Sequence, residues 1–341
     1  MSIRNSFRLA AIQAAPIYFD RDASTEKACA LIKEAGAKGA TIAAFGETWL
    51  PGYPFFMYAQ TQPMTFRALA EYIASAVEIP SPTTDKLCAA AKAAGVDVVI
   101  GIVERDPMAQ GTVYCTLLFI GRDGCILGRH RKVKPTYVER AAWGEGDAQG
   151  LRVHERPYGR ISGLNCWEHN MMLPGYALAA QGTHIHVAAW PGREPRSAAP
   201  PALTLWARQL LLSRAFASQA ACYVIAVGGV LRLADIPERY RELSIYENTG
   251  DSYIIDPRGE IIAGPARGEM ILMAEGSTEA VLAAKAVADI GGHYSRPDIL
   301  KLLVDRRPLE RLSDEVTKND TAAIVNVGEF APASSSVAAA G

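Results

Sequence analysis

A chain of 341 residues, of which 49% are hydrophobic, can bury a large core, and α/β folds of this length are common as single units. Its 35 Lys and Arg residues nearly balance its 36 Asp and Glu residues, giving a net charge of -1 without a long run of like charge. This balance gives no electrostatic reason to expect a nucleic acid or an acidic membrane surface as partner.

The sequence favours a cytoplasmic location. Residues 1–7 lack the long apolar stretch of a secretory signal, and no apolar run approaches the length of a membrane span. The cysteines are scattered and form no CxxC pair; they are Cys29, Cys88, Cys115, Cys125, Cys166 and Cys222. We therefore expect reduced thiols and no membrane partner.

Strands and helices are predicted to alternate along the first part of the chain. Short apolar runs predict strands at residues 8–14, 41–45, 96–103, 113–120 and 125–129. Apolar residues with a period near 3.6 predict helices at residues 28–35 and 82–94. We expect Gly36 and Gly39 to end the first helix and Gly95 to end the second.

The second part of the chain repeats the alternation. Strands are predicted at residues 161–165, 183–189, 222–227, 252–256, 260–263 and 270–274, and helices at 171–181, 203–219 and 278–288. Residues 231–248 are polar without a clear period and indicate an inserted loop. Alternating strands and helices are typical of an α/β fold in which helices cover sheets.

Cys166 lies where the strand at residues 161–165 gives way to a polar pair and a helix. A thiol at such an elbow lies beside unpaired backbone N–H groups. Their partial positive charge favours the thiolate and can hold a developing anion. A lone cysteine in an apolar run is, however, more often a buried structural residue. Two other positions favour the catalytic interpretation.

Glu47 and Lys132 also follow predicted strands. A carboxylate at the end of a buried strand is costly without a partner or a task, whereas the charged run at residues 130–140 could by itself be a solvated loop. Ligands of stacked α/β sheets commonly bind where strand ends converge, so we expect Glu47, Lys132 and Cys166 to share one cleft. There the carboxylate can accept the thiol proton and activate water, while the ammonium stabilises negative charge.

Three motifs resemble those of the nitrilase superfamily of carbon–nitrogen hydrolases, over roughly residues 7–300. The run FGETWLPGYP at residues 45–54 resembles the glutamate motif of that family. The run HRK at 130–132, with Pro135, Thr136, Glu139 and Arg140 after it, resembles the lysine motif. The run GLNCWEH at 163–169 resembles the cysteine motif.

The resemblance implies a role for each matching residue. Glu47 would be the general base, Lys132 the electrostatic stabiliser and Cys166 the nucleophile. Glu139 matches a further glutamate that the family places beside the lysine, where it would orient the ammonium. The backbone N–H of Trp167 is expected to help Lys132 hold negative charge.

The cysteine motif resembles the true nitrilase and cyanide-hydrolysing branch rather than the aliphatic amidase branch. The runs AAWPG at 188–192 and HYSRP at 293–297 are similar to that branch as well, whereas Val138 departs from the histidine of some nitrilases. The implied reaction converts an organic nitrile to the carboxylic acid and ammonia through a thioimidate and a thioester. The side chains expected to line the substrate pocket are Tyr53, Trp143, Trp167, Trp190 and Pro191.

Three other functions were weighed. His184 and His186 lie on one face of a predicted strand, with Glu168 and His169 nearby in sequence, but a structural zinc site wants about four ligands at set spacing. We therefore expect no metal and no cofactor, and hydrogen-bonded polar residues instead. A non-catalytic assembly protein of the same fold would lack one of the three catalytic positions, and all are present. An amidase, carbamoylase or cyanide hydratase uses the same chemistry, and only pocket shape separates these from a nitrilase.

The resemblance also implies an α/β fold of four layers, an αββα sandwich that dimerises to αββα–αββα. We assign residues 1–290 to a carbon–nitrogen hydrolase domain and residues 291–341 to a C-terminal interface tail. Its Ala- and Ser-rich end, 331–341, is expected to be disordered.

A homodimer or a larger homo-oligomer, as in the spirals of many nitrilases, is expected from the same resemblance. The helices at 171–181 and 203–219 would supply the main dimer face. Several apolar tail residues would be exposed in a monomer: Ile299, Leu302, Leu303 and Val304.

Overall fold

The computed structural model of the chain describes residues 6–59, 62–192 and 205–309. The chain divides into two compact units, Met1–Arg307 and Pro308–Gly341, and the first unit contains both large sheets. The segment 331–341, which we expected to be disordered, lies outside the described residues. The expected domain boundary at residue 290 stays a prediction.

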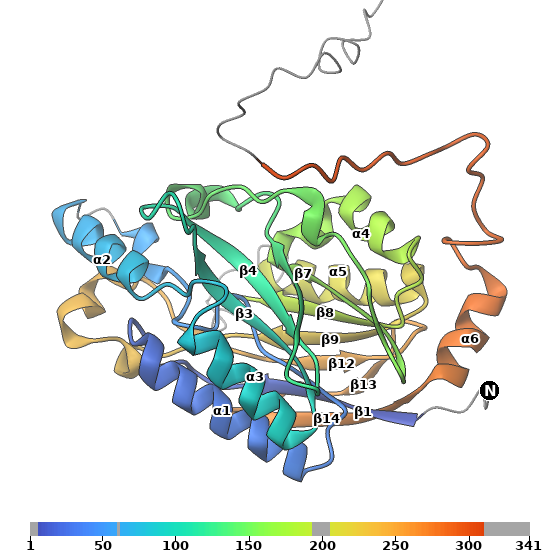
Figure 1. Ribbon diagram of the computed structural model, residues 1–341, viewed down its shortest axis with the longest axis horizontal. Helices are drawn as coiled ribbons and strands as arrows, with labels where there is room; N and C mark the ends of the chain where they lie inside the picture. The colour runs from blue at the N-terminus through green and yellow to red at the C-terminus, as the bar shows by residue number, and fades with distance from the viewer. Residues whose placement is uncertain (1–5, 60–61, 193–204, 310–341) are drawn as a thin grey trace, which may run out of the picture. The chain divides into compact units, whose positions relative to one another are not determined.

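Two six-stranded sheets form the centre of the first unit (Figure 1). The first has the strand order β14 (Met270–Ser277), β1 (Ser6–Gln13), β2 (Ile42–Ala44), β3 (Asp97–Arg105), β4 (Val113–Ile120) and β5 (Ile126–Arg131). The second has the order β13 (Ile261–Ala263), β12 (Tyr253–Ile255), β9 (Tyr223–Gly228), β8 (Ile185–Trp190), β7 (Gly159–Asn165) and β6 (His154–Arg156). A small ribbon pairs β10 (Val230–Leu231) with β11 (Asn248–Thr249).

Helices and short 3-10 turns connect the strands. The α-helices are α1 (Arg21–Ala37), α2 (Gln62–Ala74), α3 (Pro82–Ala94), α4 (Met172–Ala179), α5 (Leu205–Ala220) and α6 (Thr278–Val287). The 3-10 turns are η1 (Phe55–Tyr58), η2 (Tyr137–Ala141), η3 (Ala148–Gly150), η4 (Cys166–Asn170), η6 (Leu233–Asp235) and η7 (Glu238–Leu243). No helix in the described ranges combines the length and the hydropathy that a bilayer span requires.

Side-chain alternation along the strands buries both faces of the first sheet. Leu9 of β1 belongs to the apolar cluster between the two sheets, together with Ile185 of β8. Its neighbour Ala10 points the other way, into a cluster with Ile32 of α1 and Leu87 of α3. On the second sheet, β8, β9 and α5 share another buried cluster. The layers therefore run helix, sheet, sheet, helix, and the expected αββα sandwich is confirmed; its dimerisation stays a prediction.

Gly36 does not end the first helix, contrary to our expectation, because α1 continues to Ala37. A Cβ atom at Gly36 would lie 2.8 Å from the carbonyl oxygen of Ala94 in α3. The glycine therefore serves the close packing of α1 against α3 rather than helix termination.

Two other segments differ from the sequence predictions. Helix α2 was not predicted, since no element was assigned between residues 55 and 80. The segment 231–248 is not a simple loop, because it contains η6 and η7 and buries Tyr240 and Leu243 in an apolar cluster. Both segments pack together, with α2 in contact with η7.

Candidate active site

Glu47, Lys132 and Cys166 follow strands whose carboxyl ends lie on one edge of the sandwich. Strand β5 is antiparallel to β4, which is antiparallel to β3, so β5 runs in the same direction as β2 and β3. Glu47 and Lys132 therefore emerge at the same edge of the first sheet. In the second sheet, β7 and β8 are parallel and end at Asn165 and Trp190. The two edges meet where the Glu47 backbone N–H donates to the Trp190 carbonyl oxygen at 3.4 Å.

The Glu47 carboxylate is buried and incompletely hydrogen-bonded. Its Oε1 accepts from Lys132 Nζ at 2.8 Å and from the Cys115 thiol at 3.5 Å. Its Oε2 is buried without a hydrogen-bond partner among the described residues. Burial raises the pKa of Glu47 to about 7, against the lowering effect of the Lys132 ammonium. Glu47 is therefore suited to exchange a proton near neutral pH.

Lys132 is enclosed between two carboxylates. Its Nζ donates to Glu139 Oε2 at 2.6 Å as well as to Glu47, and it lies 5.3 Å from the centre of the Trp143 ring. Burial alone would lower the pKa of Lys132, but Glu139 and Glu47 together raise it well above its usual value. The side chain thus carries a permanent positive charge.

Glu139 is fixed by hydrogen bonds to both of its oxygens. Oε2 accepts from the Thr136 backbone N–H at 2.7 Å in addition to Lys132, and Oε1 accepts from the Tyr53 hydroxyl at 2.8 Å. The 3-10 turn η2 presents Glu139 three residues after Thr136, which its side chain caps. Glu139 therefore has no unused oxygen and holds Lys132 in place.

Cys166 lies at the predicted elbow, as the first residue of η4 and with a left-handed backbone φ of 51°. Its Sγ and one oxygen of each of Glu47 and Glu139 all lie within 4.8 Å of one another. Burial, and next Glu47, raises the pKa of Cys166 well above its usual value, although Lys132 and the Trp167 backbone N–H lower it. The elbow N–H thus acts in the expected direction, but burial and Glu47 outweigh it, so the net shift favours the thiol over the thiolate.

Glu168 ties the lysine loop to the cysteine elbow. It accepts hydrogen bonds from His130 Nε2 at 3.0 and 3.1 Å, from the Val133 backbone N–H at 2.8 Å and from the Asn165 backbone N–H at 2.8 Å. Burial alone would raise the pKa of Glu168, but His130 and the two backbone donors hold it below its usual value. Glu168 thus links His130 and Val133, which lie on either side of Lys132 in the chain, to Asn165, which precedes Cys166.

The five residues expected to line the pocket take different positions. Tyr53 and Trp143 contact Glu139 and Lys132 as described above, and their rings lie edge to face at 5.7 Å. Trp190 is buried, with its indole N–H donating to Ser213 at 3.0 Å. The Trp167 ring lies 4.9 Å from the Arg208 guanidinium, and the Pro191 carbonyl accepts from the Asn248 amide at 3.1 Å. Contact of these five residues with substrate stays a prediction.

Sequence reasoning missed two residues beside this cluster. The thiol of Cys115, on β4, contacts Glu47, and the hydroxyl of Tyr58, in η1, lies 3.5 Å from that of Tyr53. Burial raises the pKa of Tyr58, and Cys166 lies close enough to contribute. Neither residue could be predicted from a sequence pattern, because Cys115 lies within a continuous apolar strand and Tyr58 lies in a segment without a predicted element.

The arrangement around Lys132 bears on metal binding. In the described part of the chain, Glu47, Glu139 and Cys166 are the one group with ligand atoms close enough to hold an ion. The Lys132 ammonium donates to both of these carboxylates, so a cationic group already lies between them. Of the histidines weighed as ligands, His169 and His186 hydrogen-bond each other at 3.0 Å. The absence of a metal stays a prediction.

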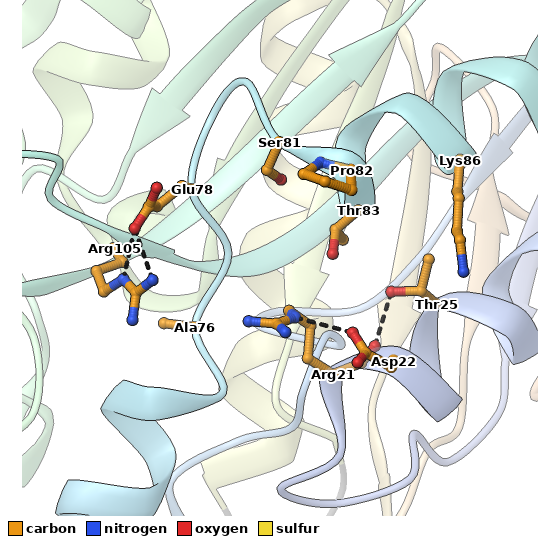
Figure 2. A pocket seen from close by; sticks show the side chains of 10 residues that line it. All are labelled: Arg21, Asp22, Thr25, Ala76, Glu78, Ser81, Pro82, Thr83, Lys86 and Arg105. Carbon is orange, nitrogen blue, oxygen red and sulfur yellow. Dashed lines mark hydrogen bonds and ion pairs between the residues drawn. The ribbon is translucent and has the colours of Figure 1, made fainter.

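A separate hollow of about 390 Å³ opens between α1 and α3. Its charged side chains pair with one another, Arg105 with Glu78 at 2.6 Å and Arg21 with Asp22 at 3.1 Å (Figure 2). Its lining includes none of Glu47, Lys132 and Cys166, and its cations are already neutralised. Among the described residues that line it, the hollow therefore offers no unpaired charged group for chemistry of its own.

Comparison with known proteins agrees with this geometry. The Carbon-nitrogen hydrolase family matches residues 8–285. "Nitrilase 2" of an unknown prokaryotic organism is 54% identical over 306 residues, covering 89% of this chain and 94% of that protein. "Aliphatic nitrilase" of Rhodococcus rhodochrous is 36% identical over 312 residues, covering 89% and 84%.

The fold has counterparts among solved structures as well. Nit3 of Saccharomyces cerevisiae, a member of branch 10 of the nitrilase superfamily, superimposes with a TM-score of 0.67 at 21% identity, covering 84% of this chain and 96% of that one. At this identity the likeness supports the fold alone. The sequence matches over most of its length show that the chain belongs to the carbon–nitrogen hydrolase family, within the nitrilase branch.

Proposed function

We propose that this protein hydrolyses an organic nitrile to the carboxylic acid and ammonia, with Cys166 as nucleophile. The observation that carries the proposal is the meeting of a thiol, a permanent ammonium and a buried carboxylate with one unused oxygen within a few ångströms. The relatives named as nitrilases support the same reaction.

The first half of the reaction attaches the substrate to sulfur. Glu47 accepts the thiol proton, and the Cys166 sulfur bonds to the nitrile carbon while one carbon–nitrogen π bond breaks. The nitrogen takes that electron pair and the proton now held by Glu47, which gives a neutral thioimidate and restores the Glu47 carboxylate. Lys132 stabilises the negative charge on nitrogen, and the Trp167 backbone N–H assists.

The second half releases ammonia and then the acid. Glu47 takes a proton from water as the water oxygen bonds to the thioimidate carbon, and a tetrahedral intermediate forms. Proton transfer to its nitrogen lets ammonia leave, so that a thioester remains on Cys166. A second water, activated in the same way, releases the carboxylic acid and restores the thiol.

Glu139 contributes by positioning in this scheme. Both of its oxygens are occupied, and its bond to Lys132 is the shorter of the two that the ammonium makes to carboxylates. Tyr53 and Trp143 complete the cluster and form one wall of the proposed pocket, with Trp167, Trp190 and Pro191 on the side of the second sheet.

The proposed assembly is a homodimer or a larger, spiral homo-oligomer. Helix α4 exposes Met172 and Leu173, and the tail exposes Ile299 and Leu303 as expected. Leu302 and Val304 are half-buried instead, and Val304 packs against the cluster of Leu151, Leu164 and Leu178. Contiguous exposed apolar side chains favour a protein interface. Truncation at Gly291 should reduce assembly and activity together, and deletion of 331–341 should leave both unchanged. Chromatography with light scattering measures the outcome, and an active monomer would contradict the proposal.

We also propose a cytoplasmic location. All six cysteines carry free thiols, as expected in a reducing compartment. We further propose that residues 1–290 form the hydrolase domain and residues 291–341 the interface tail.

The test of function is ammonia release from a panel of aliphatic, aryl and arylacetic nitriles, cyanide and the matching amides. We expect turnover of at least one nitrile, faster than turnover of its amide. Cys166→Ala should abolish release while the circular dichroism spectrum stays that of the wild type. Mass spectrometry after trapping with a slow nitrile should place the adduct on Cys166. Amide turnover alone, or an adduct on Cys115 or Cys222, would contradict the proposal.

A further inference from the structure

A chain of hydrogen bonds, buried at Ser162 and His186 and partly buried at His169, ends at the backbone of the proposed nucleophile. His169 Nδ1 lies 2.7 Å from the Cys166 carbonyl oxygen, and His169 Nε2 lies 3.0 Å from His186 Nε2. His186 Nδ1 lies 2.8 Å from Ser162 Oγ, which lies 2.7 Å from Thr183 Oγ1. Ser162 and His186 are paired in register on β7 and β8, so the parallel sheet itself sets this contact.

The carbonyl at the end of the chain fixes the order of the protons. Burial lowers the pKa of His169 to about 4 and that of His186 well below its usual value, so both imidazoles are neutral near pH 7. A carbonyl oxygen can only accept, so His169 carries its proton on Nδ1. Its Nε2 must then accept from His186 Nε2–H, and His186 Nδ1 must accept from the Ser162 hydroxyl. The three hydrogen bonds that lead from Ser162 through His186 and His169 thus all point toward the Cys166 carbonyl.

The peptide that receives this chain also faces the sulfur. The Cys166 carbonyl and the Trp167 N–H belong to one planar peptide unit, and that N–H lies close enough to the Cys166 sulfur to lower the pKa of its thiol. Successive hydrogen bonds polarise one another, so a donor at the carbonyl strengthens the N–H as a donor at the other end. The same donor holds the peptide in the orientation that the left-handed φ of Cys166 requires.

We propose that His169, oriented by His186 and Ser162, is a positioning residue that fixes and polarises the Cys166–Trp167 peptide, so that its N–H stabilises negative charge at the sulfur. This inference rests on the proposed function for its effect on turnover. Its effect on the thiol itself requires no nitrile.

The first test compares two replacements of His169. Asn places an amide N–H where His169 has Nδ1–H, so His169→Asn keeps the donor to the Cys166 carbonyl, whereas His169→Phe removes it. We expect His169→Phe to lower kcat by about 30-fold with little change in KM, and His169→Asn to recover most of that loss. A merely structural role would predict that both variants lose activity in proportion to their loss of stability.

The second test measures the thiol without substrate. The rate at which iodoacetamide alkylates Cys166 is followed against pH by mass spectrometry of the peptide that contains it. We expect His169→Phe to move the profile to higher pH by about one unit and His169→Asn to leave it near that of the wild type. Tyr158→Phe is the control, because it removes a buried hydrogen bond, to Asp97 at 2.6 Å, that does not lead to Cys166.

Ser162→Ala keeps the inference testable if His169→Phe does not fold. Without the hydroxyl, His186 can carry its proton on Nδ1 and present a lone pair to His169, so we expect the same change in alkylation at smaller size. An unchanged profile in folded His169→Phe or in Ser162→Ala would overturn the inference, whatever the turnover. A shifted profile in a protein that hydrolyses no nitrile would support the inference and count against the proposed function alone.

Discussion

Two buried glutamates of the first sheet, Glu104 and Glu47, have opposite hydrogen-bond environments. Glu104 Oε1 accepts from Arg129 at 2.6 Å and from Arg131 at 2.5 Å, and its Oε2 accepts from Arg131 at 3.1 Å and from Thr116 at 2.8 Å. In Glu47, Oε1 accepts both hydrogen bonds, from Lys132 and Cys115, and Oε2 has no partner among the described residues. The saturated carboxylate is suited to hold the sheet together, and the unsaturated one is suited to receive a proton.

The same strands supply both environments through their alternation. On β5, Arg129 and Arg131 point to Glu104, whereas His130 and the following Lys132 point to the opposite face. On β4 the neighbours Thr116 and Cys115 divide in the same way, Thr116 to Glu104 and Cys115 to Glu47. Because successive side chains of a strand point to opposite faces, neighbouring residues of β4 and β5 contribute to different clusters, one around Glu104 and one around Glu47.

The largest expected effect comes from exchanging the acid for its amide in each cluster. Glu47→Gln should lower kcat by about 10³-fold, since the general base is lost, while Lys132 keeps an oxygen acceptor. Glu104→Gln should leave kcat near the wild-type value and lower the free energy of unfolding by about 2 kcal/mol, because two arginines lose a charged partner. Turnover and urea unfolding of both variants measure this. Equal activity losses would remove the distinction between the clusters.

The next-largest effect is expected at Lys132, where a substitution can keep the charge and change only the geometry. Lys132→Arg keeps the charge, but the planar guanidinium cannot fit between Glu47 and Glu139 as a compact ammonium does, so kcat should fall by about 10²-fold or more. Glu139→Gln should lose activity through misplacement of Lys132. Wild-type turnover in Lys132→Arg would leave the lysine as only a structural charge.

The pH dependence follows from the raised pKa of Glu47. Glu47 must be ionised to accept the thiol proton, so kcat/KM should rise tenfold per pH unit below about 7 and level off above it. The contribution of Glu47 to folding stability changes with pH in the opposite direction. The folded protein retains a proton that the unfolded chain loses near pH 4.5, so this contribution to stability is lost as the pH rises through about 7. Unfolding of Glu47→Gln should therefore lack that decline, and identical declines in both proteins would contradict the assignment.

The sequence allowed the reactive cluster to be predicted better than its surroundings. Glu47, Lys132 and Cys166 each follow a strand within a recognisable motif, and convergence of strand ends at one edge brings them together. Glu139 belongs to the lysine motif and reaches the cluster from the turn η2. The fold followed from the same alternation of strands and helices. The hydrogen-bond chain behind Cys166 could not be predicted, because it depends on the register that pairs Ser162 with His186.

Packing between distant elements accounts for the remaining errors. Gly36 looks like a helix stop until α3 is placed against α1. The thiol of Cys166 looks activated by its elbow until burial and the carboxylate of Glu47 are weighed against the backbone N–H. Both corrections require contacts that a local pattern does not contain.

The smallest effect is expected at Cys115 and Thr116, neighbours on β4 that contact Glu47 and Glu104 respectively. The Cys115 thiol is a weak donor to Glu47, and its hydrogen bond lowers the pKa of that carboxyl slightly against the dominant effect of burial. Cys115→Ala should therefore reduce activity only about threefold at pH 7 and move the acid limb of the profile to higher pH. Thr116→Val should instead lower the unfolding free energy by about 1 kcal/mol without moving the profile, since its hydroxyl serves Glu104. A pH shift in Thr116→Val, or its absence in Cys115→Ala, would show that the two faces of β4 are not independent, and the contrast between the glutamates would then reflect one coupled network.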